Sequence, residues 1–404
     1  MNILIADKFS RDGIDELESA GCKVTLDPGL AGDALRAAVA ESNCTVLIVR
    51  GTRVSADVVS ASAQLSLIVR AGAGYNTIDV AAASNRAVLV ANCPGKNAVA
   101  VAELTFALIL ALDRRIVENV TDLRNGVWNK KEYTTARGLE GRTLGIIGMG
   151  KIGQAVARRG AAFDMHVVAW SRSLTDDRAE QLGVECCASP ADVADRSDVL
   201  SLHLAATPET KGLIGADVLN RLAPGSYVIN TSRAEVLDHA ALRAAIRERD
   251  IRVGLDVFED EPAGGSGAFC DAIVRAGGVV YGTHHIGAST EQAQRAIAAE
   301  AVRIVTKYKS TGLVDNCVNL APSDRAHYVL VVRHYNQPGV LAHVLGAISF
   351  ARVNVEEMEN IICAGAESAC AQIKLDAPLA DDVLEKIRKG DDRIIGVTFA
   401  RLRE

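Results

Sequence analysis

The sequence of 404 residues carries a formal net charge of −6, and 49% of its residues are hydrophobic. At roughly 100–200 residues per domain this length predicts two or three globular domains, and the acidic balance argues against nucleic acid as the main partner. Nine cysteines without a C-x-x-C pair favour reduced thiols, and we expect no metal site. The N-terminus lacks the pattern of a signal peptide, and no apolar run is long enough to span a bilayer. We therefore expect a cytoplasmic protein with no membrane partner.

Short apolar runs alternate with amphipathic stretches over the first 95 residues, which is typical of a parallel sheet flanked by helices. A second alternating series begins at Leu144 and is long enough for a doubly wound nucleotide domain. A long helix over 97–115 separates the two series, and a helix over 290–308 is expected to return the chain to the first domain. Strands are predicted at 2–6, 45–49, 66–69 and 88–90, and then at 144–147, 166–170, 199–204, 227–230, 252–257 and 279–281.

The predicted α/β architecture is therefore a Rossmann-type domain, residues 96–285, inserted in a flavodoxin-like substrate domain made of 1–95 and 286–320. After a linker at 321–324 the pattern changes to strand, helix, two strands, helix and strand within 326–404. This βαββαβ order predicts a ferredoxin-like unit of about 80 residues.

A glycine-rich motif follows the strand that starts at Leu144. Gly148, Gly150 and Gly153 fit G-x-G-x-x-G, the turn that holds a dinucleotide pyrophosphate at a helix N-terminus. An acidic residue about 20 positions later normally binds the ribose 2′-OH of NAD. Here that place reads Trp170-Ser171-Arg172, which removes the repulsion against the 2′-phosphate of NADP.

Three charged residues follow three successive strands of the nucleotide domain: Arg233, Glu261 and His285. Because ligands bind outside the carboxyl ends of parallel strands, all three are expected to face one crevice. A histidine can take a hydroxyl proton near neutral pH, a paired carboxylate favours its charged form, and a guanidinium grips a carboxylate through two hydrogen bonds. The set suits hydride transfer from a 2-hydroxy acid.

Two further arginines end strands of the first domain, Arg50 after VLIV and Arg70 after LIV. They suit a substrate with a second anionic group such as phosphate, although ordinary surface arginines would give the same pattern. The loop from Arg70 to Asn76 includes Ala73 and Gly74, whose backbone N–H groups could reach a carboxylate. A simple tight turn is the alternative.

The first 320 residues resemble the D-2-hydroxyacid dehydrogenase family, on the motifs RAGAGYNTID, AELTFALIL, LGIIGMGKIGQ, VINTSRAEVLD, GLDVFEDEP and HHIGAST. Within the family the chain is most similar to the phosphoglycerate dehydrogenases, which open the phosphorylated serine pathway. The resemblance implies that Arg233, Glu261 and His285 are catalytic and that Arg50 and Arg70 bind substrate phosphate. It also implies that Lys130 reaches across a dimer to the neighbouring site.

The same resemblance extends the expected site. On the substrate side it adds Ala73, Gly74 and Asn97. Around the nucleotide it adds Lys151, Ile152, Ser171, Arg172, His203, Thr231, Ser232, Asp256 and Gly287. Phosphoglycerate dehydrogenases resemble NAD users as a group, so we expect NAD as the cofactor, with NADP tolerated through Ser171 and Arg172. Ala234 and His284 depart from the family's usual glycine and proline.

The C-terminal motif RHYNQPGVLAHV followed by VNVEE resembles an ACT domain, a small-molecule sensor that usually pairs with another copy. His334, Asn336 and Asn354 keep the spacing of the residues that contact serine in serine-inhibited relatives. The alternative is that Asn354 only begins a strand and that 336–339 is only a turn entering a helix.

The sequence therefore predicts a dehydrogenase of a phosphorylated 2-hydroxy acid, with serine as a possible effector and self-association as a dimer or a tetramer. One alternative is an NADP-dependent glyoxylate/hydroxypyruvate reductase or another 2-hydroxyacid dehydrogenase, which would need neither Arg50 nor Arg70. A second is a nucleotide-sensing binding protein like the corepressor relatives of the family, which also keep Arg233, Glu261 and His285.

Overall fold

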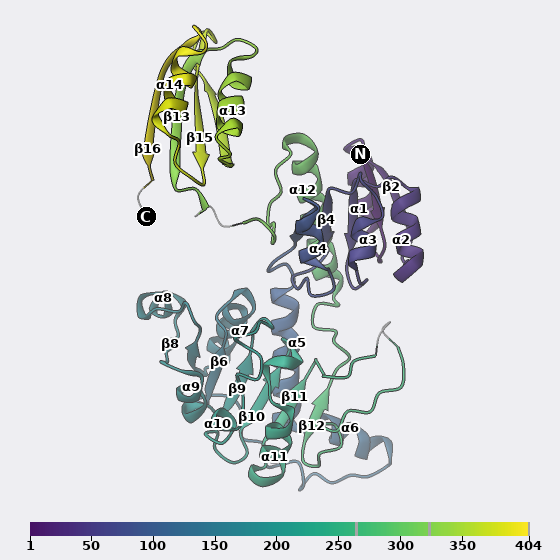
Figure 1. Ribbon diagram of the computed structural model, residues 1–404. Helices are drawn as coiled ribbons and strands as arrows, with labels where there is room; N and C mark the ends of the chain where they lie inside the picture. Colours follow the sequence, from purple (N-terminus) through teal and green to yellow (C-terminus); the bar gives the residue numbers. More distant parts are fainter. Residues whose placement is uncertain (263–265, 322–324, 403–404) are drawn as a thin grey trace. The chain divides into compact units, whose positions relative to one another are not determined.

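The computed structural model describes residues 1–262, 266–321 and 325–402. The chain divides into two compact units, Met1–Asn319 and Leu320–Glu404. The first unit contains two parallel sheets and the second contains one antiparallel sheet (Figure 1). No helix within the described residues has the length and apolar character needed to cross a membrane.

The N-terminal sheet has five parallel strands in the order β2-β1-β3-β4-β5, the flavodoxin-like order. Its strands are β1 (Asn2–Ile5), β2 (Lys23–Leu26), β3 (Val46–Val49), β4 (Leu67–Arg70) and β5 (Leu89–Asn92). Its helices are α1 (Arg11–Ser19), α2 (Gly32–Glu41), α3 (Ala56–Ser60) and α4 (Val80–Asn85). The sequence pattern missed β2, because this edge strand is mostly exposed and carries no apolar run.

Helix α12 (Glu291–Thr311) packs on this N-terminal sheet although it lies almost 200 residues after β5. Its side chains Ile297, Ala301 and Val305 join the core formed by β1, β3 and β4. The predicted return of the chain to the first sheet is thus present, while the exact domain limits at 95 and 285 stay predictions.

The second sheet has seven parallel strands in the order β12-β11-β10-β9-β6-β7-β8, the doubly wound order extended by one strand. Its strands are β6 (Thr143–Ile147), β7 (His166–Trp170), β8 (Glu185–Cys186), β9 (Val199–Leu202), β10 (Tyr227–Asn230), β11 (Arg252–Leu255) and β12 (Val280–Gly282). The two-residue strand β8 was not predicted, since it is too short to give a pattern.

Helices surround this sheet, and α5 packs on α7 and on strands β10 and β11. The helices are α5 (Ala98–Arg114), α6 (Ile116–Arg124), α7 (Lys151–Ala162), α8 (Asp176–Leu182), α9 (Pro190–Arg196), α10 (Ala216–Leu219), the 3-10 turn η1 (Ala234–Val236) and α11 (His239–Arg249). The single helix predicted over 97–115 ends at Arg115, whose left-handed backbone (φ +49°) redirects the chain into α6.

The C-terminal unit is a four-stranded antiparallel sheet in the order β14-β15-β13-β16 with two helices. Its elements are β13 (Tyr328–Tyr335), α13 (Val340–Phe350), β14 (Val355–Ile362), β15 (Ser368–Leu375), α14 (Asp381–Lys389) and β16 (Ile394–Arg401). The predicted βαββαβ order is confirmed. Of the predicted linker 321–324, residues 322–324 lie outside the described residues.

Candidate active site

A cavity of about 380 Å³ lies at the carboxyl ends of the parallel strands in the first unit. Its walls come from the ends of β4, β9, β10, β11 and β12, where the sequence pattern placed a crevice. Of the sequence-predicted site residues, it is lined by Arg70, Ala73, Gly74, Asn97, Ile152, His203, Thr231, Ser232, Arg233, Asp256, His285 and Gly287. These residues are 217 positions apart at the extremes, and the fold brings them together.

The glycine turn after β6 is held by close backbone contacts. Gly148 has φ +103°, and a side chain there would meet the carbonyl oxygen of His203 at 2.4 Å. A Cβ at Gly153 would lie 2.0 Å from the carbonyl oxygen of Gly148. A Cβ at Gly150, which precedes the first residue of α7, would meet no heavy atom within 4 Å. The turn is thus tightly packed on its inner side and open at Gly150, as a pyrophosphate at a helix N-terminus requires.

His285 and Glu261 form a direct pair, with 2.7 Å between the histidine Nδ1 and the carboxylate Oε2. The other carboxylate oxygen accepts a hydrogen bond from the Phe258 N–H at 3.0 Å. Burial raises the pKa of Glu261, but these two hydrogen bonds and the charge of His285 outweigh burial and leave the pKa below its ordinary value. The carboxylate therefore stays ionised and fixes the orientation of the imidazole ring.

Arg233 lies opposite this pair, at the end of β10. Asn230, which is fully buried, donates from its side-chain amide to the Arg233 carbonyl at 2.9 Å, and its Oδ1 accepts from the Ser232 N–H at 3.0 Å. A Cβ at Gly74 would meet the Arg233 guanidinium at 2.1 Å. Gly74 therefore leaves space for the Arg233 guanidinium. This is a structural role beside the substrate contact that we predicted for Gly74.

Positive charge gathers on the substrate side of the cavity. Burial, with the charges of Arg233 and Arg50 nearby, lowers the pKa of Arg70 to about 10. One oxygen of Asp7 accepts the backbone N–H groups of Arg50 and Gly51 at 2.6 and 3.1 Å, which fixes the loop after β3. Mutual repulsion between guanidinium groups favours binding of an anion among them.

Sequence reasoning missed Asp7 and Asn230 because both act through the backbone of their neighbours rather than on a ligand. The position of each residue at the end of a predicted strand could have indicated it. Asp7 is the first acidic residue after β1, and Asn230 is the last residue of β10. Polar residues at these strand ends are expected near a ligand crevice.

Asp256 was expected near the cofactor, and it lines the cavity. Its carboxylate oxygens, however, accept hydrogen bonds from other residues of the chain. One oxygen accepts from the Thr283 hydroxyl at 2.6 Å and from the Ile286 N–H at 2.8 Å, and the other accepts from the Gly287 N–H at 2.8 Å. These three bonds bracket His285, whose backbone is left-handed at φ +52°. Asp256 therefore holds the turn that presents the imidazole.

Three cavity-lining polar atoms have no hydrogen-bond partner within the described part of the chain: Nε of Arg70, Nδ1 of His203 and Oδ1 of Asn97. Burial lowers the pKa of His203 to about 3, so its ring is neutral, and Nε2 lies 2.8 Å from the Ser201 hydroxyl. Buried polar atoms without partners are costly, so all three are free to bond a bound molecule.

Arg50, Glu261, Gly148, Gly150 and Gly153 are not among the residues that line the cavity, and four further expected site residues also lie outside its walls. Lys151 is the first residue of α7, and its side chain packs against Gly95, whose φ is +77°. Ser171 is half-buried and Arg172 is exposed after β7. A hydrogen bond to Thr207 and the charge of Arg172 lower the pKa of Glu209. Lys130 is exposed and lies away from the cavity of its own chain.

In the C-terminal unit the expected effector residues His334 and Asn354 do not meet, whereas Asn336 lies at the His334 end of the sheet and donates from its amide to the Ala366 carbonyl at 3.0 Å. His334 is buried, and its Nε2 lies 3.2 Å from Asn360 Oδ1, whereas the Asn354 amide bonds Glu356 at 2.8 Å. His334 pairs with Ala369 of β15, while Val355, next to Asn354, pairs with Leu375. Six residues of strand separate the two positions, roughly 20 Å. Within one chain they cannot touch the same small molecule.

Comparison with known proteins agrees with the nucleotide-binding geometry. Residues 106–300 match the family model described as D-isomer specific 2-hydroxyacid dehydrogenase, NAD binding domain. The chain is 35% identical over 324 residues to the D-3-phosphoglycerate dehydrogenase of Methanocaldococcus jannaschii, an alignment that covers 79% of this chain and 60% of that protein. The chain thus spans about three fifths of the length of the curated relatives that it matches.

Solved structures share the fold of the first unit. A protein from Thermus thermophilus is 31% identical with a TM-score of 0.69, covering 79% of this chain and 100% of that one. The NAD⁺-bound 3-phosphoglycerate dehydrogenase of Entamoeba histolytica is 25% identical with a TM-score of 0.67, covering 80% and 99%. Together with the glycine turn and the paired His285 and Glu261, these matches show that residues 106–300 are similar to the NAD-binding domain of the D-isomer specific 2-hydroxyacid dehydrogenases.

Proposed function

We propose that the chain interconverts D-3-phosphoglycerate and 3-phosphohydroxypyruvate with NAD(H), the first step of phosphorylated L-serine synthesis. The observation that carries this proposal is the convergence of the His285–Glu261 pair and the arginines Arg233, Arg70 and Arg50 beside a dinucleotide turn. Curated relatives with this name, at 30–37% identity, support the same substrate.

His285 is the acid/base of the proposed reaction. Its Nδ1 bonds Glu261, so Nε2 is the nitrogen left to take the hydroxyl proton of the substrate. The ionised carboxylate stabilises the imidazolium that results. NAD⁺, when bound, supplies the acceptor for the C2 hydride. In the reverse direction His285 returns the proton to the carbonyl oxygen.

The arginines bind different ends of the proposed substrate. Arg233, which donates from Nη1 to the Ser232 carbonyl at 2.7 Å, retains its other donors for the substrate carboxylate and C2 oxygen. Arg70 and Arg50 bind the phosphate at the far end. With the two anionic ends fixed on opposite cations, C2 is held between the base and the nucleotide.

The nucleotide is held by the turn of Gly148, Gly150 and Gly153, with Ile152, His203, Thr231 and Gly287 along its path. The open backbone at Gly150 fits such a ligand, and so does Nδ1 of His203, which has no hydrogen-bond partner in the described ranges. Thr231 is fixed by a 2.9 Å hydrogen bond to Thr105 of α5. The NAD-binding family model supports NAD as the cofactor, with NADP tolerated because Ser171 and Arg172 stand in the acidic position.

A second candidate function is favoured by that same position. A glyoxylate/hydroxypyruvate reductase that uses NADPH would employ the Ser171-Arg172 turn for the 2′-phosphate and the Arg233, Glu261 and His285 set for chemistry. It would leave the Arg70 and Arg50 cations without an anion to bind.

Self-association is proposed from an apolar surface on α5, α6 and the segment that follows. Exposed residues there are Val99, Leu110, Ile116, Val117, Val120, Leu123, Val127 and Trp128, the last 81% exposed. Patches of this kind mark interfaces. A dimer over this surface would bring Lys130 to the neighbouring site.

The C-terminal unit is proposed to be an ACT domain with serine as its effector. Because His334 and Asn354 lie at opposite ends of their sheet, an effector that uses both must bind between two copies. Pairing of these units would convert a dimer into a tetramer.

We predict that Arg50→Ala raises the KM for D-3-phosphoglycerate about tenfold or more, the value of one hydrogen bond to a charged group. The rate with D-glycerate should hardly change, because that substrate lacks the phosphate. Initial rates with NAD⁺ at alkaline pH and with product trapping measure both. Arg53→Ala, an exposed arginine on the same loop, is the control. Failure to oxidise phosphoglycerate, with brisk NADPH-dependent reduction of glyoxylate, would favour the reductase.

We predict that Glu261→Gln lowers the melting temperature at pH 7 and that the difference from the unmodified chain disappears in acid. The folded pKa of Glu261 is below 4.5, so its stabilising effect is complete above the unfolded pKa and is lost as the pH falls through the folded pKa. Calorimetric scans from pH 7 to pH 3 test this, with Asp260→Asn as the control. A difference that is constant across the range contradicts the pairing.

We predict that Ser171→Asp weakens NADPH binding about tenfold or more, because a carboxylate repels the 2′-phosphate. NADH binding should change much less, since an acid there can bond the ribose hydroxyl. Isothermal titration with both nucleotides measures the two affinities. An equal loss for both would show that Ser171 does not contact this part of the nucleotide.

We predict that millimolar L-serine slows the reaction and that Asn354→Ala removes this inhibition without changing the uninhibited rate. Asn354 lies on the unit that carries no part of the cavity. Initial rates with and without serine measure the effect, and D-serine is the control. Unchanged activity in L-serine contradicts the effector proposal and leaves the catalytic proposal intact.

A further inference from the structure

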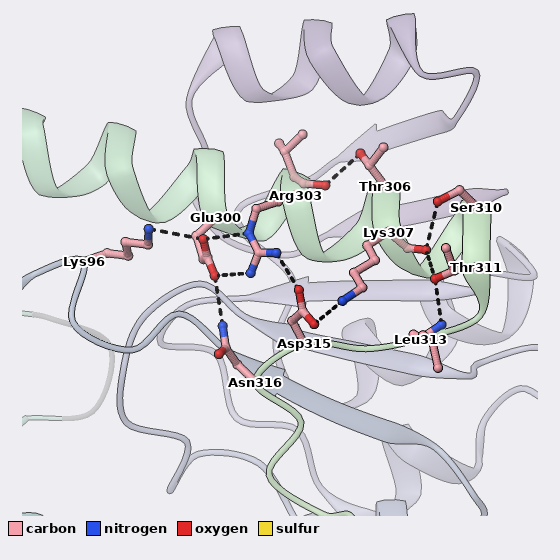
Figure 2. Close-up of polar contacts among 11 residues, drawn as sticks. Lys96, Glu300, Arg303, Thr306, Lys307, Ser310, Thr311, Leu313, Asp315 and Asn316 are labelled. Carbon is pink, nitrogen blue, oxygen red and sulfur yellow. Dashed lines mark hydrogen bonds and ion pairs between the residues drawn. The ribbon is translucent and has the colours of Figure 1, made fainter.

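The carboxylate of Glu300 on α12 is buried and contacts three polar side chains (Figure 2). The residue is 7% exposed. Arg303 donates to both of its oxygens, at 3.1 and 2.7 Å, and Lys96 lies 3.2 Å from one of them. The Asn316 side-chain amide donates to the other at 2.9 Å. The Arg303 hydrogen bonds lower the pKa of Glu300 to about 2, so this carboxylate is charged at all physiological pH values.

Two of these partners lead to the same short segment, residues 92–97, which follows β5. Lys96 belongs to the segment and contacts Glu300 directly. Asn316 reaches its other end, because the Asn316 carbonyl accepts the Asn92 N–H at 3.3 Å. An adjacent antiparallel bridge joins Ala91 to Cys317. Glu300 therefore restrains segment 92–97 at both ends.

Each end of the segment carries a group that forms the cavity wall. The side-chain amide of Asn92 donates to the carbonyl of Ala73 at 2.6 Å, which holds the loop that contains Gly74. At the other end, Asn97 directly follows Lys96 and lines the cavity, and its Oδ1 has no hydrogen-bond partner among the residues that the structure describes. The Cys93 N–H also donates to the Gly72 carbonyl at 2.9 Å. Both walls on the substrate side thus depend on where segment 92–97 sits.

We propose that Glu300 is a positioning residue that clamps segment 92–97 through Lys96 and Asn316, and so sets the places of Ala73 and Asn97 for the substrate. This inference rests on the proposed function for the identity of the substrate, but the clamp itself is a property of the fold. The nucleotide turn is packed by the Gly148 contacts with His203 and touches the segment through Lys151 at Gly95, so we expect the clamp to act mainly on the substrate and much less on NADH.

The rest of the charged network offers a control. Arg303 and Lys307 of α12 also pair with Asp315, which directly precedes Asn316 in the chain (Figure 2). The Asp315 carboxylate pairs with Arg303 and Lys307, and neither of these is an arm of the clamp. Asp315→Asn therefore weakens the network of α12 while leaving both arms of the clamp in place.

The experiment compares Lys96→Met, Asn316→Gly and Glu300→Gln with Asp315→Asn in the full chain. Lys96→Met removes one arm, and its side chain is 41% exposed, so the fold should tolerate the change. Asn316→Gly removes the other arm at a left-handed position, φ +54°, that glycine adopts freely. Lys96→Arg keeps the charge and should restore most of the lost function.

Two readouts decide the outcome. Loss of either arm should raise the KM for 3-phosphohydroxypyruvate about fivefold, the size of a partly exposed ion pair, with kcat and the NADH dissociation constant nearly unchanged. Amide hydrogen exchange should accelerate in peptides covering 71–76 and 92–98. In Asp315→Asn both readouts should stay as in the unmodified chain.

The clamp is refuted if Lys96→Met and Asn316→Gly change neither exchange nor KM more than Asp315→Asn does. It is also refuted if KM, NADH affinity and melting temperature all shift together, because that pattern indicates general destabilisation. If the unmodified chain does not act on 3-phosphohydroxypyruvate, the proposed function fails, and the exchange measurement alone still decides the clamp.

Discussion

The active-site geometry depends on one buried carboxylate, that of Asp256. Its oxygens accept hydrogen bonds from Thr283, Ile286 and Gly287, on both sides of His285. A non-glycine residue in the left-handed region costs of the order of 1–3 kcal/mol and needs surrounding structure to hold it. Because this turn is fixed, the imidazole of His285 meets Glu261 at 2.7 Å and faces the end of β10 where Arg233 stands.

On the substrate side of the cavity, like charges are held close together. The guanidinium of Arg70 is buried near two others, and its own Nε has no hydrogen-bond partner in the part of the chain that the structure describes. Such a cluster is unfavourable by itself and becomes favourable when an anion enters it. The loop of small residues at 71–74 allows this crowding, because a side chain at Gly72 or Gly74 would overlap a guanidinium. For the proposed phosphorylated substrate, relief of this repulsion would contribute to the binding free energy.

The two units divide the proposed work. The first unit contains every residue of the cavity wall, and the second presents a sheet with His334 at one end and Asn354 at the other. These two residues are separated by the length of a strand, so one unit alone cannot bring both of them to the same small molecule. In the proposed effector site a second copy of the unit would complete the set, so the proposed effector response would depend on assembly.

The sequence by itself determined the strand-and-helix order, the glycine turn and the convergence of Arg233, Glu261 and His285, because these follow from local periodicity and from the rule that parallel strands end at one edge. Tertiary structure alone decided the strands β2 and β8, since short polar edge strands are defined by their neighbours. It also decided the roles of Asp256 and Glu300. Their partners lie about 30 and 200 positions away in the chain, and no local pattern encodes a hydrogen bond across that distance.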